Sequence, residues 1–132
     1  MNENIDLSRS YLERAFDEFY DAQLLYNNSR YNSSISRAYY CVFHCINACI
    51  YLYGFEFQKH SAVITKFREL FIKTGKFEAI LSDIIKDLFE FRNICDYDVG
   101  FKADIKQAKI CLESAKLFYD KVSDFINSRE NL

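Results

Sequence analysis

Hydrophobic residues recur along this chain with the spacing of α-helices rather than of strands. Between Asp6 and Asn28 they fall three and four residues apart, at Leu12, Ala15, Phe19, Ala22 and Tyr26. The last third of the chain repeats the spacing at Ile105, Ala108, Leu112, Ala115, Tyr119, Val122 and Ile126. This alternation places side chains on one face of a helix. Both segments are therefore predicted to be amphipathic helices that pack on a shared core.

The segment from Ser33 to Tyr53 is apolar on more than one side, which predicts the most buried helix. From Ala38 to Phe55 it has no charged side chain, over a length at which a membrane span becomes possible. However, His44 lies in its middle, and an all-round apolar helix is also typical of the centre of a bundle. We expect no membrane span, and we expect Asn32 or Ser33 to cap this helix.

Two more helices are expected between these segments. Gly54 should end the central helix, because glycine readily takes the left-handed conformation of a helix terminus. Ser61 is expected to cap a short third helix that Thr74-Gly75 closes, and a fourth helix should run from Phe77 to Cys95. The prediction is an all-α fold, a five-helix up-down bundle with a short third helix, forming a single domain over residues 1–132.

Composition supports long helices and a reduced, cytoplasmic environment. The chain has no proline and three glycines, so residues that break helices are scarce. Its five cysteines are an odd number and no secretion signal is recognisable, so we expect free thiols in the cytoplasm. Seventeen basic and nineteen acidic residues give a net charge of −2. Any contact with nucleic acid must therefore be local.

A cysteine-rich stretch of the central helix invites a zinc interpretation, which we consider the weaker one. Cys41, His44, Cys45 and Cys49 are three and four residues apart. Tetrahedral zinc sites rarely take three or four ligands from one straight helix, whereas small buried cysteines let helices approach closely. We therefore expect no metal site and no cofactor, and a structural role for His44.

Three segments together carry a resemblance to a known family. They are YNSSISRAYYCVFH (31–44), KHS (59–61) and FRNICDYD (91–98), in that order. In order and spacing they resemble the HEPN-domain family, over roughly Asp6 to Phe125, and most closely its small stand-alone members often encoded beside a minimal nucleotidyltransferase. The resemblance implies a helical bundle that dimerises through its central helices. It also implies a prokaryotic toxin–antitoxin or defence system.

Many HEPN proteins are metal-independent ribonucleases whose motif is an arginine, four to six residues, then a histidine. Arg92 matches the arginine, but Tyr97 occupies the later position, and no histidine follows His60. Arg92, Tyr97 and Asp96 are the catalytic candidates, with Arg92 as the group that holds phosphate. Residues five apart on a helix point about 140° away from each other, so Arg92 and Tyr97 should cooperate only if the helix ends between them or two subunits contribute.

The candidate residues for binding RNA or a nucleotide are Arg92, Lys59, His60 and Arg37. A second interpretation makes Arg92 a structural anchor that pairs with Asp96 or Asp98. Basic residues also concentrate between Arg30 and Lys76, where they could form a phosphate-facing rim.

Three functions follow from these patterns. The first is a dimeric toxin-like protein that binds RNA or nucleotide phosphate at a cleft between subunits, with metal-independent ribonuclease activity through the degenerate motif as one form of it. The second is a non-catalytic partner or antitoxin that binds a minimal nucleotidyltransferase and is modified on Tyr97. The third is a purely structural helical adaptor that uses exposed aromatic residues.

Overall fold

The computed structural model describes residues 2–130, and within them all regular structure is helical. The long helices are α1 (Asn2–Asn27), α2 (Tyr31–Leu52), α4 (Ile80–Tyr97) and α5 (Ile105–Glu130), and the short one is α3 (His60–Phe67). A wider π-type turn, Arg68–Ile72, continues α3. The predicted all-α bundle of five helices with a short third helix is confirmed.

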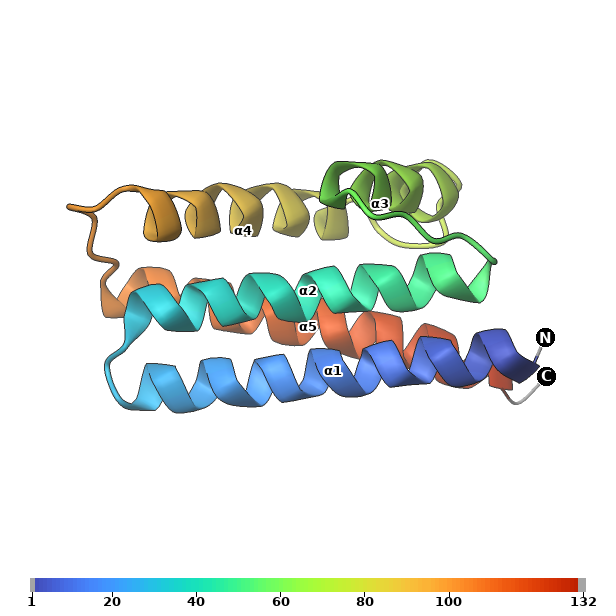
Figure 1. Cartoon of the computed structure of the whole chain (residues 1–132), viewed down its shortest axis with the longest axis horizontal. Helices are drawn as coiled ribbons and strands as arrows, with labels where there is room; N and C mark the ends of the chain where they lie inside the picture. Colours follow the sequence, from blue (N-terminus) through green and yellow to red (C-terminus); the bar gives the residue numbers. More distant parts are fainter. Residues whose placement is uncertain (1, 131–132) are drawn as a thin grey trace.

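The four long helices run alternately in opposite directions, as short connections between neighbours require (Figure 1). The helix α2 lies at the centre, with α1 on one side, α5 behind it and α4 on the other side. The short helix α3 lies over the last part of α2, next to the beginning of α4. This arrangement brings the first half of α2 opposite the last half of α4.

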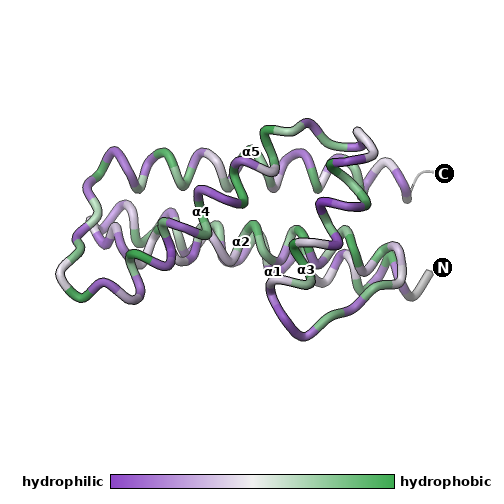
Figure 2. The backbone as a smooth tube through the Cα atoms, turned by 90° about the horizontal axis from the view of Figure 1, so that it is seen from above, coloured by the Kyte–Doolittle hydropathy of each residue, from purple (hydrophilic) through white to green (hydrophobic). Residues whose placement is uncertain are grey.

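The core follows the predicted hydrophobic pattern, and α2 contributes most to it. Thirteen residues of α2 are buried, among them Tyr39, Ile46 and Ile50 at no more than 1% exposure. Along the other helices, hydrophobic and hydrophilic residues alternate, so each buries one face and exposes the other (Figure 2). Among the described residues, no helix combines the length and apolar character that crossing a membrane requires.

Two predicted helix caps are wrong. The helix α2 begins at Tyr31, and α3 begins at His60, and neither has a side-chain cap at its first turn. Asn32 instead ties α2 to the loop before α5, donating to the Phe101 carbonyl at 2.9 Å and accepting from the Ala103 amide at 2.7 Å. A contact far along the chain therefore outweighs the local cap. The predicted glycine terminations hold, with φ of 86° at Gly54 and 77° at Gly75.

The fourth helix is shifted relative to its predicted limits. It begins at Ile80 rather than Phe77, because Phe77 leaves the helical path and packs its ring on Phe71 and Phe125. It also continues past Cys95 to Tyr97. Asp96 and Tyr97 are therefore helical, and the helix does not end between Arg92 and Tyr97.

Candidate functional site

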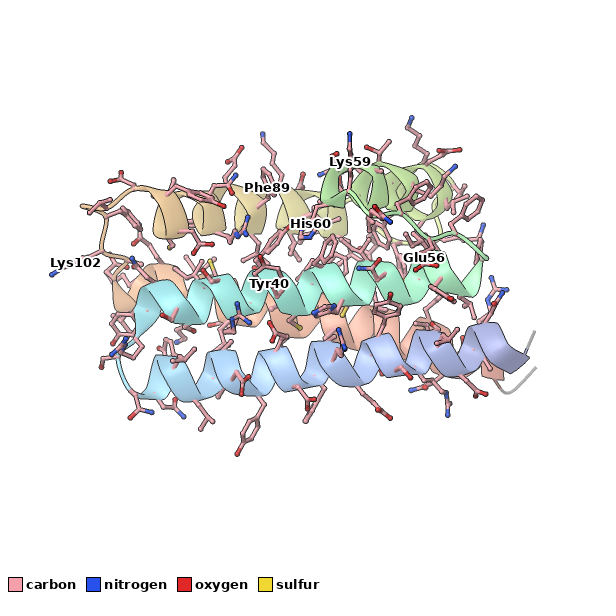
Figure 3. The ribbon with its side chains drawn as sticks, in the orientation of Figure 1. Tyr40, Glu56, Lys59, His60, Phe89 and Lys102 are labelled. Carbon is pink, nitrogen blue, oxygen red and sulfur yellow. The ribbon has the colours of Figure 1, made fainter. Side chains whose placement is uncertain are left out.

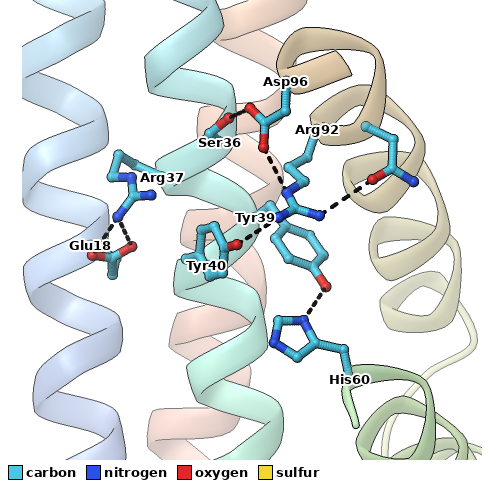
Figure 4. A network of polar contacts seen from close by, with 9 residues as sticks. Glu18, Ser36, Arg37, Tyr39, Tyr40, His60, Arg92 and Asp96 are labelled. Atoms are coloured by element: carbon cyan, nitrogen blue, oxygen red, sulfur yellow. Dashed lines mark hydrogen bonds and ion pairs between the residues drawn. The ribbon is translucent and has the colours of Figure 1, made fainter.

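The Arg92 side chain lies between α4 and α2, where it contacts groups from both helices (Figure 4). Its Nη2 donates to the Tyr40 hydroxyl at 2.7 Å, and its Nη1 donates to the Asn93 side-chain oxygen at 3.3 Å. Its Nε lies 2.9 Å from Asp96 Oδ2, forming an ion pair. Only 16% of the side chain is exposed. The guanidinium is thus fixed in position rather than free in bulk water.

Asp96 positions the arginine rather than standing free as a base. Its Oδ2 pairs with Arg92, and its Oδ1 accepts from the Ser36 hydroxyl at 2.6 Å. Both carboxylate oxygens are thereby engaged. The alternative anchor, Asp98, instead accepts from the Gly100 amide at 3.1 Å in the loop that follows α4.

Three tyrosine rings surround the guanidinium. The Arg92 Cζ atom lies 5.3 Å from the ring centroids of both Tyr39 and Tyr40, and 5.9 Å from that of Tyr97. Such distances are typical of cation–π contacts, which favour the charged arginine. The two residues therefore come into contact within one chain, with α4 unbroken between them. The long arginine side chain spans the angle between them at the last turn of α4.

His60, the first residue of α3, joins the same network from the other side. Its Nδ1 lies 3.4 Å from the Tyr39 hydroxyl, and its ring stacks on Phe43 with centroids 3.9 Å apart. Its edge also faces the Tyr40 ring at 6.4 Å. A histidine that is 32 residues from Arg92 in the sequence is therefore linked to it through one tyrosine (Figure 4).

Arg37 does not join this network, although both arginines contact Tyr40. Its Nη1 lies 3.1 and 2.9 Å from the two carboxylate oxygens of Glu18 on α1. Its Cζ lies 4.9 Å from the Tyr40 ring centroid. Lys59 precedes His60 and is exposed at the start of α3 (Figure 3). Of the predicted binding residues, the structure thus brings Arg92 and His60 into one network, leaves Lys59 exposed before His60, and pairs Arg37 elsewhere.

The electrostatics of the site favour a charged arginine beside a neutral histidine. Burial acts to lower the pKa of Arg92, but Tyr40 and Asp96 outweigh it and raise that pKa overall. Burial and the charge of Arg92 both lower the pKa of His60, which favours its neutral form near pH 7. Burial raises the pKa of Tyr39 to about 12, so its hydroxyl keeps its proton. A neutral imidazole has a free nitrogen lone pair that can accept a proton.

The cysteine-rich stretch of α2 forms part of the core. Cys41, Cys45 and Cys49 are buried and free, and burial raises the pKa of both Cys45 and Cys49. Neutral thiols are poor metal ligands. No group of three or more metal-ligating side chains is found in the part of the chain that the structure describes.

Three α2 residues that contact the Arg92 side chain or its partner Asp96 were not among the predicted site residues: Ser36, Tyr39 and Tyr40. Tyr40 and Ser36 are four residues apart on α2, as Arg92 and Asp96 are on α4. Four-residue spacing places each pair on one helix face. Two such polar pairs, one on each helix, are a signal that the two faces meet. Tyr39 gave no comparable signal, because tyrosine is also common in helix cores.

Comparisons with known proteins agree with this architecture. The family model described as "HEPN domain" matches residues 8–125. A "UPF0332 protein" of Thermotoga maritima is 32% identical over 96% of both chains. A protein of Methanocaldococcus jannaschii named "Putative toxin MJ0142" is 28% identical over 92% of this chain and 82% of its own length. A second protein of that organism, "Putative toxin MJ0605", is 29% identical over 84% of this chain and 82% of its own length.

Proposed function

The chain belongs to the HEPN domain family, and from that premise we propose that it is a toxin-like protein that binds RNA at Arg92 and cleaves it without a metal ion. Two similar proteins bear the name of toxins, which supports the toxin-like part of the proposal. The observation that carries the rest is a fixed, charged guanidinium within a network that also contains a histidine.

Arg92 suits the role of phosphate ligand because its charge is permanent and its position is fixed. A guanidinium donates paired hydrogen bonds that fit two phosphate oxygens. Two of its three bonds inside the protein are to neutral groups, Tyr40 and Asn93, so only Asp96 offsets its charge. A preorganised cation of this kind stabilises the negative charge that develops on phosphorus during cleavage.

His60 supplies the proton acceptor that the sequence motif lacks. When its Nδ1 donates to the Tyr39 hydroxyl oxygen, the lone pair of Nε2 is free to take the proton of a ribose 2′-hydroxyl. The 2′-oxygen then bonds to phosphorus, and the bond from phosphorus to the 5′-oxygen breaks. The Tyr97 hydroxyl donates a proton to that leaving oxygen and regains one from water, and His60 gives up to water the proton that it accepted. The products are a 2′,3′-cyclic phosphate and a free 5′-hydroxyl.

The active form is proposed to be a homodimer in which two copies of α2 lie side by side. The face of α2 that carries Tyr40, His44 and Asn47 is only half-buried, between α1 on one side and α3 and α4 on the other. A second copy packed there would enclose Tyr40, and with it the approach to Arg92. Asn47→Arg, which adds charge to this face, should produce a monomer in light-scattering measurements of molar mass. An unchanged dimer would place the interface elsewhere.

The ribonuclease proposal is tested by incubating the purified protein with mixed cellular RNA in excess chelator. Wild type should produce fragments that end in 2′,3′-cyclic phosphate, and Arg92→Ala should produce none. Arg37→Ala is the matched control, since it removes an arginine that is already paired with Glu18. Failure of the wild type to cleave, or equal cleavage by Arg92→Ala, would overturn the proposal.

A second candidate function rests on the exposure of Tyr97. This residue ends α4 and is 73% exposed, so another enzyme could reach its hydroxyl. In this alternative the chain is the non-catalytic partner or antitoxin of a minimal nucleotidyltransferase that modifies Tyr97. Co-expression with a minimal nucleotidyltransferase should then add the mass of a nucleotide to the wild type and not to Tyr97→Phe. An unmodified wild-type mass would refute this alternative.

A further inference from the structure

A hollow of about 630 Å³ lies between α3 and the first half of α4, next to the Arg92 network. Its volume is within the range of small-molecule binding pockets, roughly 300–1,000 Å³. Its apolar lining comes from Ile64, Ile85 and Phe89. Ile64 and Ile85 are almost fully buried, whereas Phe89 is 39% exposed and offers its ring to a ligand.

The polar lining of the hollow is mainly cationic. Lys59 and Arg68 come from the α3 side and Lys86 from α4, against the single carboxylate of Glu90. Arg68 is held in position, because its Nε donates to the Ser82 hydroxyl at 2.9 Å and its Nη2 to the Ser82 carbonyl at 3.3 Å. In a chain with a net charge of −2, three cations around an apolar surface favour a ligand that is both anionic and flat.

The hollow shares His60 with the site already described. His60 lines it and also contacts the hydroxyl of Tyr39, whose ring packs on Arg92. Phe89 likewise lies between the two, with its ring centroid 6.0 Å from that of Tyr39. Figure 3 shows Phe89, His60 and Lys59 gathered where α3 meets α4. Tyr39, which contacts both Phe89 and Arg92, therefore links the hollow to the proposed phosphate site.

We propose that this hollow is a nucleobase subsite, which receives one unstacked base of a single-stranded RNA whose adjoining phosphate is bound at Arg92. This inference rests on the proposed RNA-binding function and adds where the substrate is recognised. The base stacks on Phe89, and Lys59 and Lys86 attract the phosphates on either side of it. Stacking on an aromatic ring is the usual way in which proteins bind an unpaired base.

The test compares two ligands in fluorescence-anisotropy titrations. One is a short 2′-O-methyl oligonucleotide, which lacks the attacking hydroxyl and so is not cleaved. The other has the same backbone without bases. Wild type should bind the base-containing ligand roughly tenfold more tightly, as one stacked base would provide. Phe89→Leu, which keeps an apolar side chain in the hollow, should remove this preference. Phe16→Leu is the matched control, because Phe16 is 50% exposed and lies on α1.

The outcomes separate the subsite from the general function. If wild type binds both ligands equally, or if Phe89→Leu keeps the preference, the subsite is overturned while RNA binding at Arg92 stands. Such a result would mean that the hollow does not bind a nucleobase. If wild type binds neither ligand, the proposed function fails and the subsite fails with it. Loss of the preference in Phe89→Leu alone supports the subsite.

Discussion

Arg92 and Arg37 both contact the Tyr40 ring, yet their other partners differ, and with them the charge that each arginine can offer to a phosphate. The Nη1 of Arg37 lies within 3.1 Å of both carboxylate oxygens of Glu18. Arg92 has one carboxylate partner, Asp96, which also accepts from Ser36, and its other bonds are to neutral Tyr40 and Asn93. The ability of an arginine to bind phosphate thus depends on how much of its charge is already neutralised by carboxylates of the protein.

The largest expected difference between the two arginines is in catalysis. Arg92→Gln should lower the rate of RNA cleavage by about 100-fold or more, since it removes the preorganised charge at the phosphate. Arg37→Gln should change the rate by less than roughly twofold, because its charge is already paired. Single-turnover cleavage of a defined RNA measures both. Equal losses in the two variants would contradict the claim that Arg92, and not Arg37, acts on the phosphate.

The next effect concerns the proton acceptor beside Arg92. His60→Gln should slow cleavage by about 100-fold while leaving RNA affinity nearly unchanged, because a base acts on the rate and not on binding. The wild-type rate should rise with pH as His60 loses its proton, at a pH below that of an ordinary histidine. His60→Gln should lose this rise. A variant with the wild-type pH profile would remove His60 from the mechanism.

A smaller effect should separate positioning from charge at Arg92. Asp96→Asn keeps the shape of the side chain and removes the charge that offsets Arg92. We expect RNA affinity to be maintained or to increase, and the cleavage rate to fall roughly tenfold because the guanidinium loses its alignment. Titration and single-turnover kinetics on the same preparation distinguish the two quantities. A large loss of affinity would contradict this role for Asp96.

The charge of Arg37 can be released by removing the charge of its partner, Glu18. Glu18→Gln should release the charge of Arg37 and strengthen RNA binding by roughly two- to fivefold, a range typical of one exposed ion pair. The pKa of Glu18 is raised, by burial above all. Acidification should therefore protonate Glu18 and strengthen RNA binding by the wild type, at a pH above the pKa of an ordinary glutamate. Weaker binding by Glu18→Gln would contradict the idea that this pair masks Arg37.

The smallest effect is on stability and involves the two histidines near Tyr40. Burial above all lowers the pKa of His44, and burial also lowers that of His60, so the unfolded chain binds protons more readily than the folded one. Stability should therefore fall as the pH drops below the ordinary histidine value of 6.5. The Tm should be lower at about pH 5.5 than at about pH 7.5, and the difference should be smaller in His44→Gln. A larger difference in that variant would refute the assignment.

Much of the fold could be predicted because it depends on periodicity that the sequence displays directly. The apolar positions of α1 and α5 identify their buried faces, except that Ile105 at the start of α5 is 51% exposed, and Gly54 and Gly75 end segments as expected. The caps could not be predicted, since Asn32 bonds the loop at Phe101 and Ala103, a contact set by tertiary structure. The link from His60 to Arg92 was equally hidden, because it depends on how α3 lies against α2 and α4.

The central claim is that Arg92 is a phosphate ligand, and the salt dependence of RNA binding tests it most directly. Each phosphate contact contributes about 0.7 to the slope of log affinity against log salt concentration for single strands. With an uncleavable 2′-O-methyl oligonucleotide, Arg92→Gln should reduce the slope by about that amount, and Arg37→Gln should leave it unchanged. Identical slopes for wild type and Arg92→Gln would contradict the claim.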